Sequence, residues 1–469
     1  MNPEIRNELT QLTITGLRHR LSGIVSRKPD ISLPRSFVTA WSLKLDAIVV
    51  GAGVTGITAA LELQQRGLKV MLLDQQSLAQ GCSFVSAGVI YPGAFRSSTY
   101  YRIPELPAAF FKASSSSALD WRSAPGLLSW CVQYARATRS DIVWHGRDLL
   151  HELCRDSLRS LELLLGSDLP PLSRCGHLAV HLSSCEVDRA TCLNSIRTSL
   201  GEAVRIVSGG ELAALEPAIC RLALGPSAAG ATFLAGAAHV TDTAAFVASL
   251  ADVFVQRGGL LCFDRVQGLN SARCGKVAVK CARGDYSPGT VVLATGAHSN
   301  RLLADCDHRI PLVAEIGYHI ELDVEPGFIS RPVSLSGLGV VLTPSERGAR
   351  ISGFSHFGLP CFRARPDLLL SALDRVRKTL PGLRARPGFE VRSGERPSTQ
   401  DSLPVIERVP GHRSIFVSTG HGHLGLTLAA VSAGILADLV TNGSSSYESE
   451  LSSQRFSRST NSEAVLRAA

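Results

Sequence analysis

The chain has 469 residues, with 45% hydrophobic and 19% charged side chains, so it can bury a large core in two or three compact units. Its net charge of +8 is typical of a solvated basic surface, and no basic run is interleaved with aromatic residues, which argues against nucleic acid as a partner. No uninterrupted stretch of roughly 18 apolar residues occurs and no signal-peptide core is present, so we expect neither a transmembrane helix nor a signal peptide.

Residues 1–45 form an N-terminal extension. Its leucines and isoleucines fall roughly on one helical face over residues 1–28, with arginines elsewhere, so the segment is either an interfacial amphipathic helix or a poorly ordered extension. The 12 cysteines of the chain form no C-x-x-C pair, so we expect no metal site and reduced, mostly buried thiols in a cytoplasmic protein.

Residues 46–74 read as strand, glycine turn, helix, strand and acid, with glycines at the spacing G-x-G-x-x-G. The first glycine allows a tight turn, the second lets a pyrophosphate approach, the third lets the helix pack on the strand, and the acid accepts ribose hydroxyls. The alternative is a glycine-rich turn in another α/β protein. The expected dinucleotide contacts of this unit are Ala47, Ile48, Val49, Val50, Gly51, Ala52, Gly53, Val54, Thr55, Gly56 and Asp74.

Further elements follow from hydrophobic periodicity. We expect helices over residues 145–166, 244–255, 366–380 and 424–439, and strands over 260–263, 277–280, 291–293 and 414–419. One strand–helix–strand unit cannot supply a whole sheet, and strand–glycine–helix elements recur near 291–302 and 414–439. We therefore expect an α/β fold whose Rossmann-like domain is assembled from the discontinuous segments 46–110, 230–305 and 388–443. An inserted α+β substrate domain would comprise 111–229 and 306–387, and 444–469 would be a disordered tail rich in serine.

Three segments carry a resemblance to a known family: CSFVSAGVI from Cys82, RPSTQDSLPVI from Arg396 and GHGHLGLT from Gly420. In this order they resemble FAD-dependent D-amino acid dehydrogenases of the small-subunit type, within the D-amino acid oxidase and glycine oxidase superfamily. The likeness covers roughly residues 45–443. Among its departures, Glu407 stands where a small residue is usual.

The resemblance implies that FAD lies extended across the Rossmann-like domain, with its ADP half on the glycine unit. Ser83, Ala87 and Gly88 would line the flavin, and Val266 would pack near the adenine. The A-T-G segment ending at Gly296 would pass under the dinucleotide. The pyrimidine edge of the flavin, where reduction places negative charge, would face the loop with Gly420, His421, Gly422 and Gly425 and the helix that follows.

The resemblance also implies that Arg396 holds the substrate carboxylate, because a guanidinium fits a carboxylate bidentately. Tyr318 would either reach the same carboxylate or pack as a half-buried strand residue. His421 and His423 would either assist amine deprotonation or be structural, and Asp401 would orient the loop after Arg396.

The expected activity is oxidative deamination of a D-amino acid to a 2-oxo acid and ammonia, with FAD as cofactor and a quinone of the respiratory chain as acceptor. The expected location is cytoplasmic, with peripheral contact to the inner face of the cell membrane. Two alternatives remain: oxidation of glycine, sarcosine or an opine-like secondary amine, and a non-catalytic flavin-binding subunit.

Overall fold

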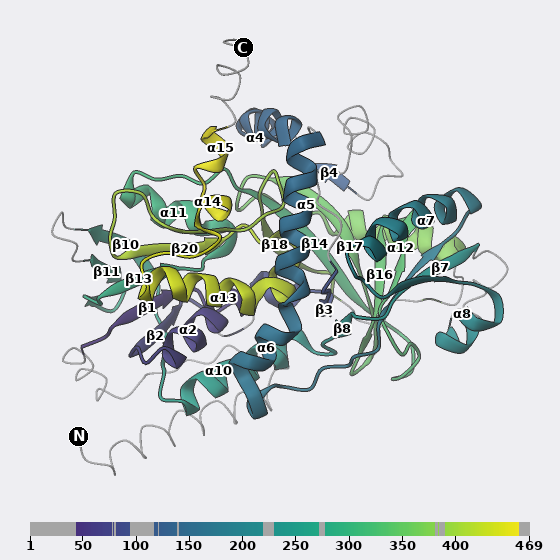
Figure 1. Cartoon of the computed structure of the whole chain (residues 1–469), viewed down its shortest axis with the longest axis horizontal. Helices are drawn as coiled ribbons and strands as arrows, with labels where there is room; N and C mark the ends of the chain where they lie inside the picture. Colours follow the sequence, from purple (N-terminus) through teal and green to yellow (C-terminus); the bar gives the residue numbers. More distant parts are fainter. Residues whose placement is uncertain are drawn as a thin grey trace.

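The computed structural model describes residues 44–458 except 77, 79–80, 94–116, 121, 138–139, 219–228, 272–276, 380–382 and 384–389. The amphipathic segment expected over residues 1–28 lies outside the described residues. Two large sheets occupy opposite halves of the molecule, with β1, β13 and β20 in one half and β16, β17 and β7 in the other (Figure 1).

The first sheet has six strands in the order β19-β20-β13-β1-β2-β9. The strands are Val405–Arg408, Ile415–Thr419, Thr290–Leu293, Ala47–Val50, Val70–Asp74 and Leu260–Phe263, and all neighbours are parallel except β19 and β20. Strands from three distant parts of the chain therefore lie side by side. This confirms a Rossmann-like domain built from discontinuous segments.

Both faces of this sheet are covered, and the strand period of two assigns each residue to a face. Ala47 and Val49 of β1 pack into the core made with the helices α2 (Val54–Gln65), α10 (Thr243–Gln256) and α13 (Gly425–Thr441). Ile48 and Val50 pack on the opposite face, against β10 (Val266–Ser271) and β11 (Val277–Cys281). Such a doubly buried sheet explains why its strands read as continuous apolar runs.

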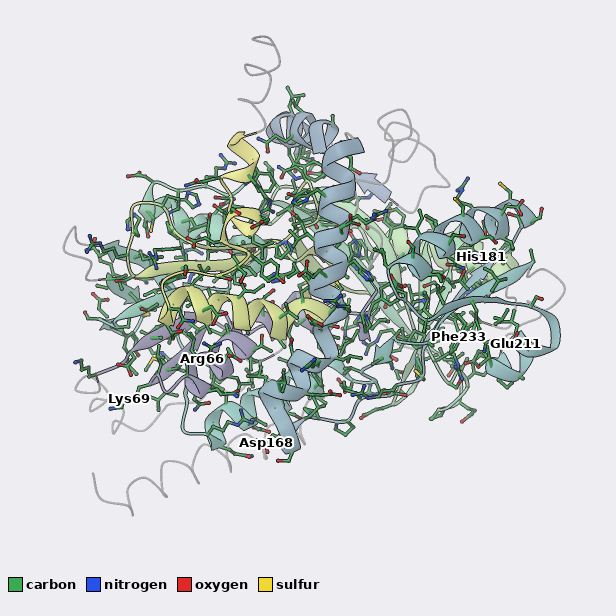
Figure 2. The ribbon with its side chains drawn as sticks, in the orientation of Figure 1. Arg66, Lys69, Asp168, His181, Glu211 and Phe233 are labelled. Carbon is green, nitrogen blue, oxygen red and sulfur yellow. The ribbon has the colours of Figure 1, made fainter. Side chains whose placement is uncertain are left out.

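The second sheet has the order β18-β14-β17-β16-β15-β5-β7-β6, with β4 paired to β17. Its strands are Arg392–Ser398, Val313–Leu322, Gly348–Gly358, Val340–Ser345, Val333–Leu335, His177–His181, Gly230–Leu234, Val204–Val207 and, for β4, Ser117–Leu119. The helices of this half include α7 (Ser184–Ser199), α8 (Gly209–Leu215) and α12 (Pro366–Thr379). Figure 2 labels His181 and Phe233 in this half, and Arg66 and Lys69 beyond α2 in the other.

The remaining described elements complete the fold. The helices are α4 (Ala124–Ala137), α5 (Ser140–Arg155), α6 (Ser157–Leu165), α11 (Ser299–Leu303), α14 (Glu448–Leu451) and α15 (Arg455–Arg458), with the short 3₁₀ turns η2 (Cys82–Val85), η4 (Gly166–Asp168), η5 (Gly296–His298), η6 (Ala304–Cys306), η7 (Ser336–Leu338) and η8 (Gly422–Leu424). The short strands are β3 (Val89–Ile90), β8 (Ala238–His239) and β12 (Asp285–Tyr286). The helix expected over 145–166 is thus two helices, which meet at Asp156.

The predicted domain boundaries need correction for two helices and two strands. Helices α5 and α6 were expected in the substrate domain, but their leucines pack into the core beneath α13 of the Rossmann-like half. Strands β7 and β18 were expected in the Rossmann-like domain, but backbone pairing with β5 and β14 places them in the second sheet. Packing between distant segments decides the place of the two helices, and strand pairing decides that of β7 and of β18; local sequence patterns encode neither.

The expectation of a disordered tail after residue 443 is wrong for residues 444–458. Helices α14 and α15 fold back onto the Rossmann-like half, and Leu451 is fully buried in its core. The carboxylate of Glu407 on β19 accepts hydrogen bonds from Ser452 Oγ at 2.8 Å and from the Ser453 N–H at 2.9 Å, and His308 contacts its other oxygen at 2.9 Å. Glu407, one of the departures from the family pattern, therefore anchors this tail.

In the described part of the chain, one helix, Gly422–Thr441, is long and apolar enough to span a membrane by length and composition alone. Most of it is buried inside the protein, because α13 packs against α2 and lies in the core. Thr58 on α2 donates a hydrogen bond to the Ala429 carbonyl at 3.0 Å. Its apolar composition is that of a core helix.

Candidate active site

A cavity of about 800 Å³ lies where the two halves of the molecule meet, a volume within the range of cofactor and substrate sites. Its lining comes from the glycine loop after β1, the end of β2, the turn η2, the turn η5 after β13, the strand β18 and the turn η8 before α13. Both sheets contribute, so one ligand end can rest on the Rossmann-like half while the other faces the second sheet.

The glycine loop has steric requirements at each glycine. Gly51 has φ +108°, and a Cβ there would lie 2.5 Å from the carbonyl oxygen of Ala294. A Cβ on Gly56 would overlap the carbonyl oxygen of Gly51. Gly53 faces the cavity, and a Cβ on it would lie 3.3 Å from Ser83 Oγ. The pattern thus provides a tight turn, a helix packed on that turn and a backbone surface open to a ligand.

Asp74, at the end of β2, is tied to this loop. Its carboxylate accepts the Ala52 N–H at 2.7 Å and the Gln76 N–H at 2.9 Å. Each carboxylate oxygen has a second lone pair, and Asp74 lines the cavity. The side chain can therefore accept ribose hydroxyls while it fixes the loop.

Two helices present their N-termini to the same cavity. Helix α2 begins after Gly53 and helix α13 after Leu424, and neither of these N-cap residues makes a side-chain capping hydrogen bond. Ser83 Oγ accepts the Val54 N–H at 3.1 Å. Helix N-termini favour anionic groups. One such end suits a pyrophosphate and the other suits a reduced flavin edge, so the residues present fit FAD.

Most predicted cofactor residues line this cavity: Val50, Gly51, Ala52, Gly53, Val54, Thr55, Asp74, Ser83, Ala87, Val266, Gly296, His421, Gly422 and Gly425. Six others are not among its lining residues: Ala47, Ile48, Val49, Gly56, Gly88 and Gly420. The first three are buried strand residues. The three glycines shape the backbone: Cβ atoms at Gly88 and Gly420 would meet Val240 and Thr399, respectively.

Arg396 lines the cavity from β18, where it pairs in register with Glu315 of β14. Its side chain is 15% exposed, and Nη1 lies 3.3 Å from Glu315 Oε1. The guanidinium extends over Gly317, where any Cβ would overlap it. The glycine beside Tyr318 therefore provides the room in which Arg396 reaches the cavity.

Glu315 was not predicted as a functional residue. Its side chain is 1% exposed, and it accepts hydrogen bonds from Ser355 Oγ at 2.5 Å and Ser398 Oγ at 2.8 Å. His423 Nε2 lies 2.5 Å from Glu315 Oε1. Burial raises the pKa of Glu315, but the interactions with His423, Arg396 and Ser355 lower it by more than burial raises it. The pKa of Glu315 therefore lies well below its usual range. The available signal was an acid among the apolar residues Val313, Ala314 and Ile316 at the start of β14.

Tyr318 was predicted near the substrate, and this prediction is wrong for the structure. The side chain is fully buried in the core of the second sheet and is not among the residues that line the cavity. Its hydroxyl contacts His356 Nδ1 at 3.0 Å and accepts the Arg365 N–H at 2.9 Å. Burial raises the pKa of Tyr318 to about 12. The residue is structural, the second of the two possibilities open from the sequence.

The two histidines of the loop before α13 differ in surroundings. His421 is buried, and its Nε2 lies 2.9 Å from Ser432 Oγ. Burial lowers the pKa of His421 to about 4, so it is neutral near pH 7. His423 is 53% exposed and lines the cavity beside Glu315. Asp401 accepts the Leu403 N–H at 3.1 Å and pairs with Arg455, so it orients the loop after Arg396 as expected.

Cysteine chemistry has little place in this cavity. The Cys82 thiol lines it, and burial raises the pKa of this thiol to about 11, so the thiolate is scarce near pH 7. At the other side of β18, Cys361, His298 and Glu395 also line the cavity, and the sequence did not single them out. In the part of the chain that the structure describes, no group of three or more His, Cys, Asp or Glu residues is placed to hold a metal ion.

Comparison with known proteins identifies the class. Residues 46–439 match the family described as FAD dependent oxidoreductase (DAO), and the chain belongs to that family. It is therefore an FAD-dependent oxidoreductase, and the residues of the cavity described above fit its cofactor.

Individual relatives resemble the chain at low sequence identity. The chain is 29% identical over 427 residues to a D-amino acid dehydrogenase of Cereibacter sphaeroides, covering 86% of this chain and 93% of that protein. It is 25% identical over 415 residues to a D-amino-acid oxidase of Bradyrhizobium diazoefficiens, covering 84% and 94%. The structure of glycine oxidase from Geobacillus kaustophilus matches with a TM-score of 0.66 at 20% identity, covering 88% of this chain and 99% of that one, which shows a shared fold.

Proposed function

We propose that the protein oxidises D-amino acids to 2-oxo acids and ammonia. The observation that carries this proposal is the guanidinium of Arg396 on the cavity wall, placed over Gly317 and held by a buried carboxylate. A guanidinium in such a place suits the carboxylate common to all amino acids. The relatives named D-amino acid dehydrogenase and D-amino-acid oxidase support the choice of D-amino acids.

The protein contributes binding and orientation to this reaction. Bound FAD supplies the two-electron acceptor for the hydride that leaves the substrate Cα. Arg396 holds the carboxylate and so limits the substrate to a few orientations. The lone pair of the uncharged amine forms the C=N bond of an iminium ion as the hydride leaves, and addition of water then releases ammonium and the 2-oxo acid. His421 is neutral and already bonded to Ser432, so it orients the loop and does not serve as a base.

For the electron acceptor we propose a quinone of the respiratory chain, with the protein on the inner face of the cell membrane and released by salt. The net charge of +8 supports contact with an anionic leaflet. Fractionation at low and high ionic strength, with quinone and oxygen reduction assayed in each fraction, tests this part. A protein found only in the soluble fraction that forms one peroxide per substrate would contradict it.

The decisive experiment is an absorbance spectrum of the FAD-loaded protein before and after anaerobic addition of D-alanine. Reduction of the flavin by D-alanine and not by L-alanine is expected. Reduction by glycine or sarcosine but not D-alanine would replace the proposal with the secondary-amine alternative. A spectrum that none of these compounds changes, at concentrations that saturate the site, would favour a non-catalytic flavin subunit.

A further inference from the structure

Arg396 does not form a simple cationic site, because a negative charge lies beside it. In the described part of the chain, the ion pairs of Glu315 are those with Arg396 and His423. Glu315 and Arg396 together carry no net charge. An anionic substrate that approaches Arg396 therefore meets a neutral pair, unless His423 carries a proton. The third member of the cluster decides whether its net charge is zero or +1.

The geometry makes the three side chains one unit. Glu315 Oε1 is shared by Arg396 Nη1 at 3.3 Å and by His423 Nε2 at 2.5 Å. Glu315 is fixed from behind by Ser355 and Ser398, whereas Arg396 and His423 both line the cavity. The three residues come from β14, β18 and η8, so the buried carboxylate joins two strands to the turn before α13.

The other ionisable groups near this cluster have partners or fixed charges of their own. His421, on the same turn, is buried with a pKa lowered to about 4 by burial. The Cys82 thiol, which faces Arg396 and Glu315, has a pKa raised to about 11 by burial. Glu395, beside Arg396 on β18, lies 3.6 Å from His298 and accepts the Cys361 N–H at 3.1 Å. His423 is the member of the cluster with an imidazole, the side chain whose ordinary change of charge falls near neutral pH.

We propose that His423 and Arg396 bind the substrate carboxylate together, that Glu315 is the residue that positions both, and that the substrate therefore binds together with one proton taken up at His423. The proposal deepens the proposed function, on which it rests for the nature of the substrate. Its sign follows from linkage: the anion binds tightly when His423 is protonated, and its affinity falls as the pH rises and that proton is lost.

The test uses propionate, which has the carboxylate of D-alanine and no amine to titrate. Its dissociation constant for the FAD-loaded protein is measured from the change in flavin absorbance between roughly pH 6 and pH 9, the range in which a histidine titrates. We expect the constant to rise with pH, with a limiting slope of about tenfold per pH unit because one proton accompanies each anion. Calorimetry in two buffers of different ionisation enthalpy should detect the same proton uptake.

Three variants assign the effect. His423→Asn should bind propionate as weakly as the wild type does at roughly pH 9, and its dissociation constant should not change with pH. The matched control His298→Asn, which removes another cavity histidine that pairs with Glu395, should keep the wild-type pH dependence. Glu315→Gln removes the negative charge but keeps the side-chain shape, so propionate should bind more tightly than to the wild type at roughly pH 9.

A dissociation constant that does not change with pH in the wild type, or a His423→Asn variant that keeps the wild-type dependence, would overturn the proposal. The Asn variant decides the matter even if Glu315→Gln yields no folded protein. The two proposals also fail separately. Flavin reduction by D-alanine without pH-dependent propionate binding contradicts this inference alone, whereas pH-dependent binding without reduction contradicts the proposed reaction alone.

Discussion

Gly56, in the first turn of α2, packs against the carbonyl oxygen of Gly51, so closely that a Cβ at position 56 would overlap that oxygen. The Gly56→Ala variant must move α2 away from the turn that receives the dinucleotide. We expect a loss of about 1–3 kcal/mol in the free energy of unfolding and reduced FAD content. Urea denaturation and the ratio of flavin to protein absorbance measure both. Gly434→Ala is the control: position 434 lies in α13 with open space around it, so this variant should match or slightly exceed wild-type stability.

FAD should be held without a covalent bond. The cavity thiol of Cys82 is protonated near pH 7, and His421 is buried against Ser432. Acid precipitation of the yellow protein should therefore leave the flavin in the supernatant, where its spectrum and mass identify FAD. Flavin that remains in the washed pellet would point to covalent attachment.

The Arg396→Lys variant retains a positive charge near Glu315 but loses the planar fork that binds a carboxylate at two points. We expect kcat/KM for D-alanine to fall by an amount equivalent to about 2–4 kcal/mol, with unchanged FAD content. Arg392→Lys, on the same strand but stacked over Phe84, is the matched control and should keep wild-type kinetics. Similar kinetics for wild type and Arg396→Lys would refute the assignment.

Tyr318→Phe separates a structural from a catalytic role at that position. The hydroxyl bonds the buried His356 ring and the Arg365 N–H, so its removal should lower the free energy of unfolding by about 1–3 kcal/mol. Because the side chain does not line the cavity, KM and kcat for D-alanine should stay at wild-type values. A large rise in KM without loss of stability would instead return Tyr318 to the substrate.

The Glu407 anchor predicts a pH dependence of stability. Burial raises the pKa of Glu407, but hydrogen bonds from His308, Ser453 and Ser452 lower it by more than burial raises it. The pKa therefore lies below the ordinary value of 4.5. A group with a lowered pKa in the folded state stabilises the fold above its unfolded pKa, and this contribution disappears as the pH falls through the folded pKa. Glu407→Gln should therefore be less stable than wild type by about 1–3 kcal/mol near pH 7. The difference in melting temperature should shrink below pH 4.5. A constant difference at all pH values would exclude the charge as its origin.

The dinucleotide loop could be predicted from the sequence because its backbone conformation requires glycine at fixed positions. Gly51 has φ +108°, Gly56 packs on the carbonyl oxygen of Gly51 five residues earlier, and Asp74 ends the adjacent strand. The same holds for the helices α10, α12 and α13, whose periodicity predicted their positions to within a few residues. The turn conformation, the contact between Gly51 and Gly56 and the helical periodicity all lie within short windows of sequence.

Tyr318 is a core residue because it shares a face of β14 with Ile316, Ile320 and Leu322. This alternation is visible in the sequence, but which face of the strand meets the cavity depends on how the two halves pack. Glu315 and the ordered tail were not predicted because their partners lie far away in the chain. Glu315 contacts Arg396, and the tail contacts Glu407.

The order of strands in the six-stranded sheet also constrains how this enzyme is made. β1 leaves the ribosome early, yet its neighbour β13 appears only after β4, β5, β6 and β7 of the second sheet have been synthesised, and β20 later still. One edge of β1 must therefore wait for a distant partner, which is the situation that slows folding and invites aggregation. Helix α13, whose N-terminus completes the cavity, is among the last parts to emerge. Chains released before residue 441 lack an intact α13, so flavin capture must follow synthesis of this helix and can report on whether the helix was made.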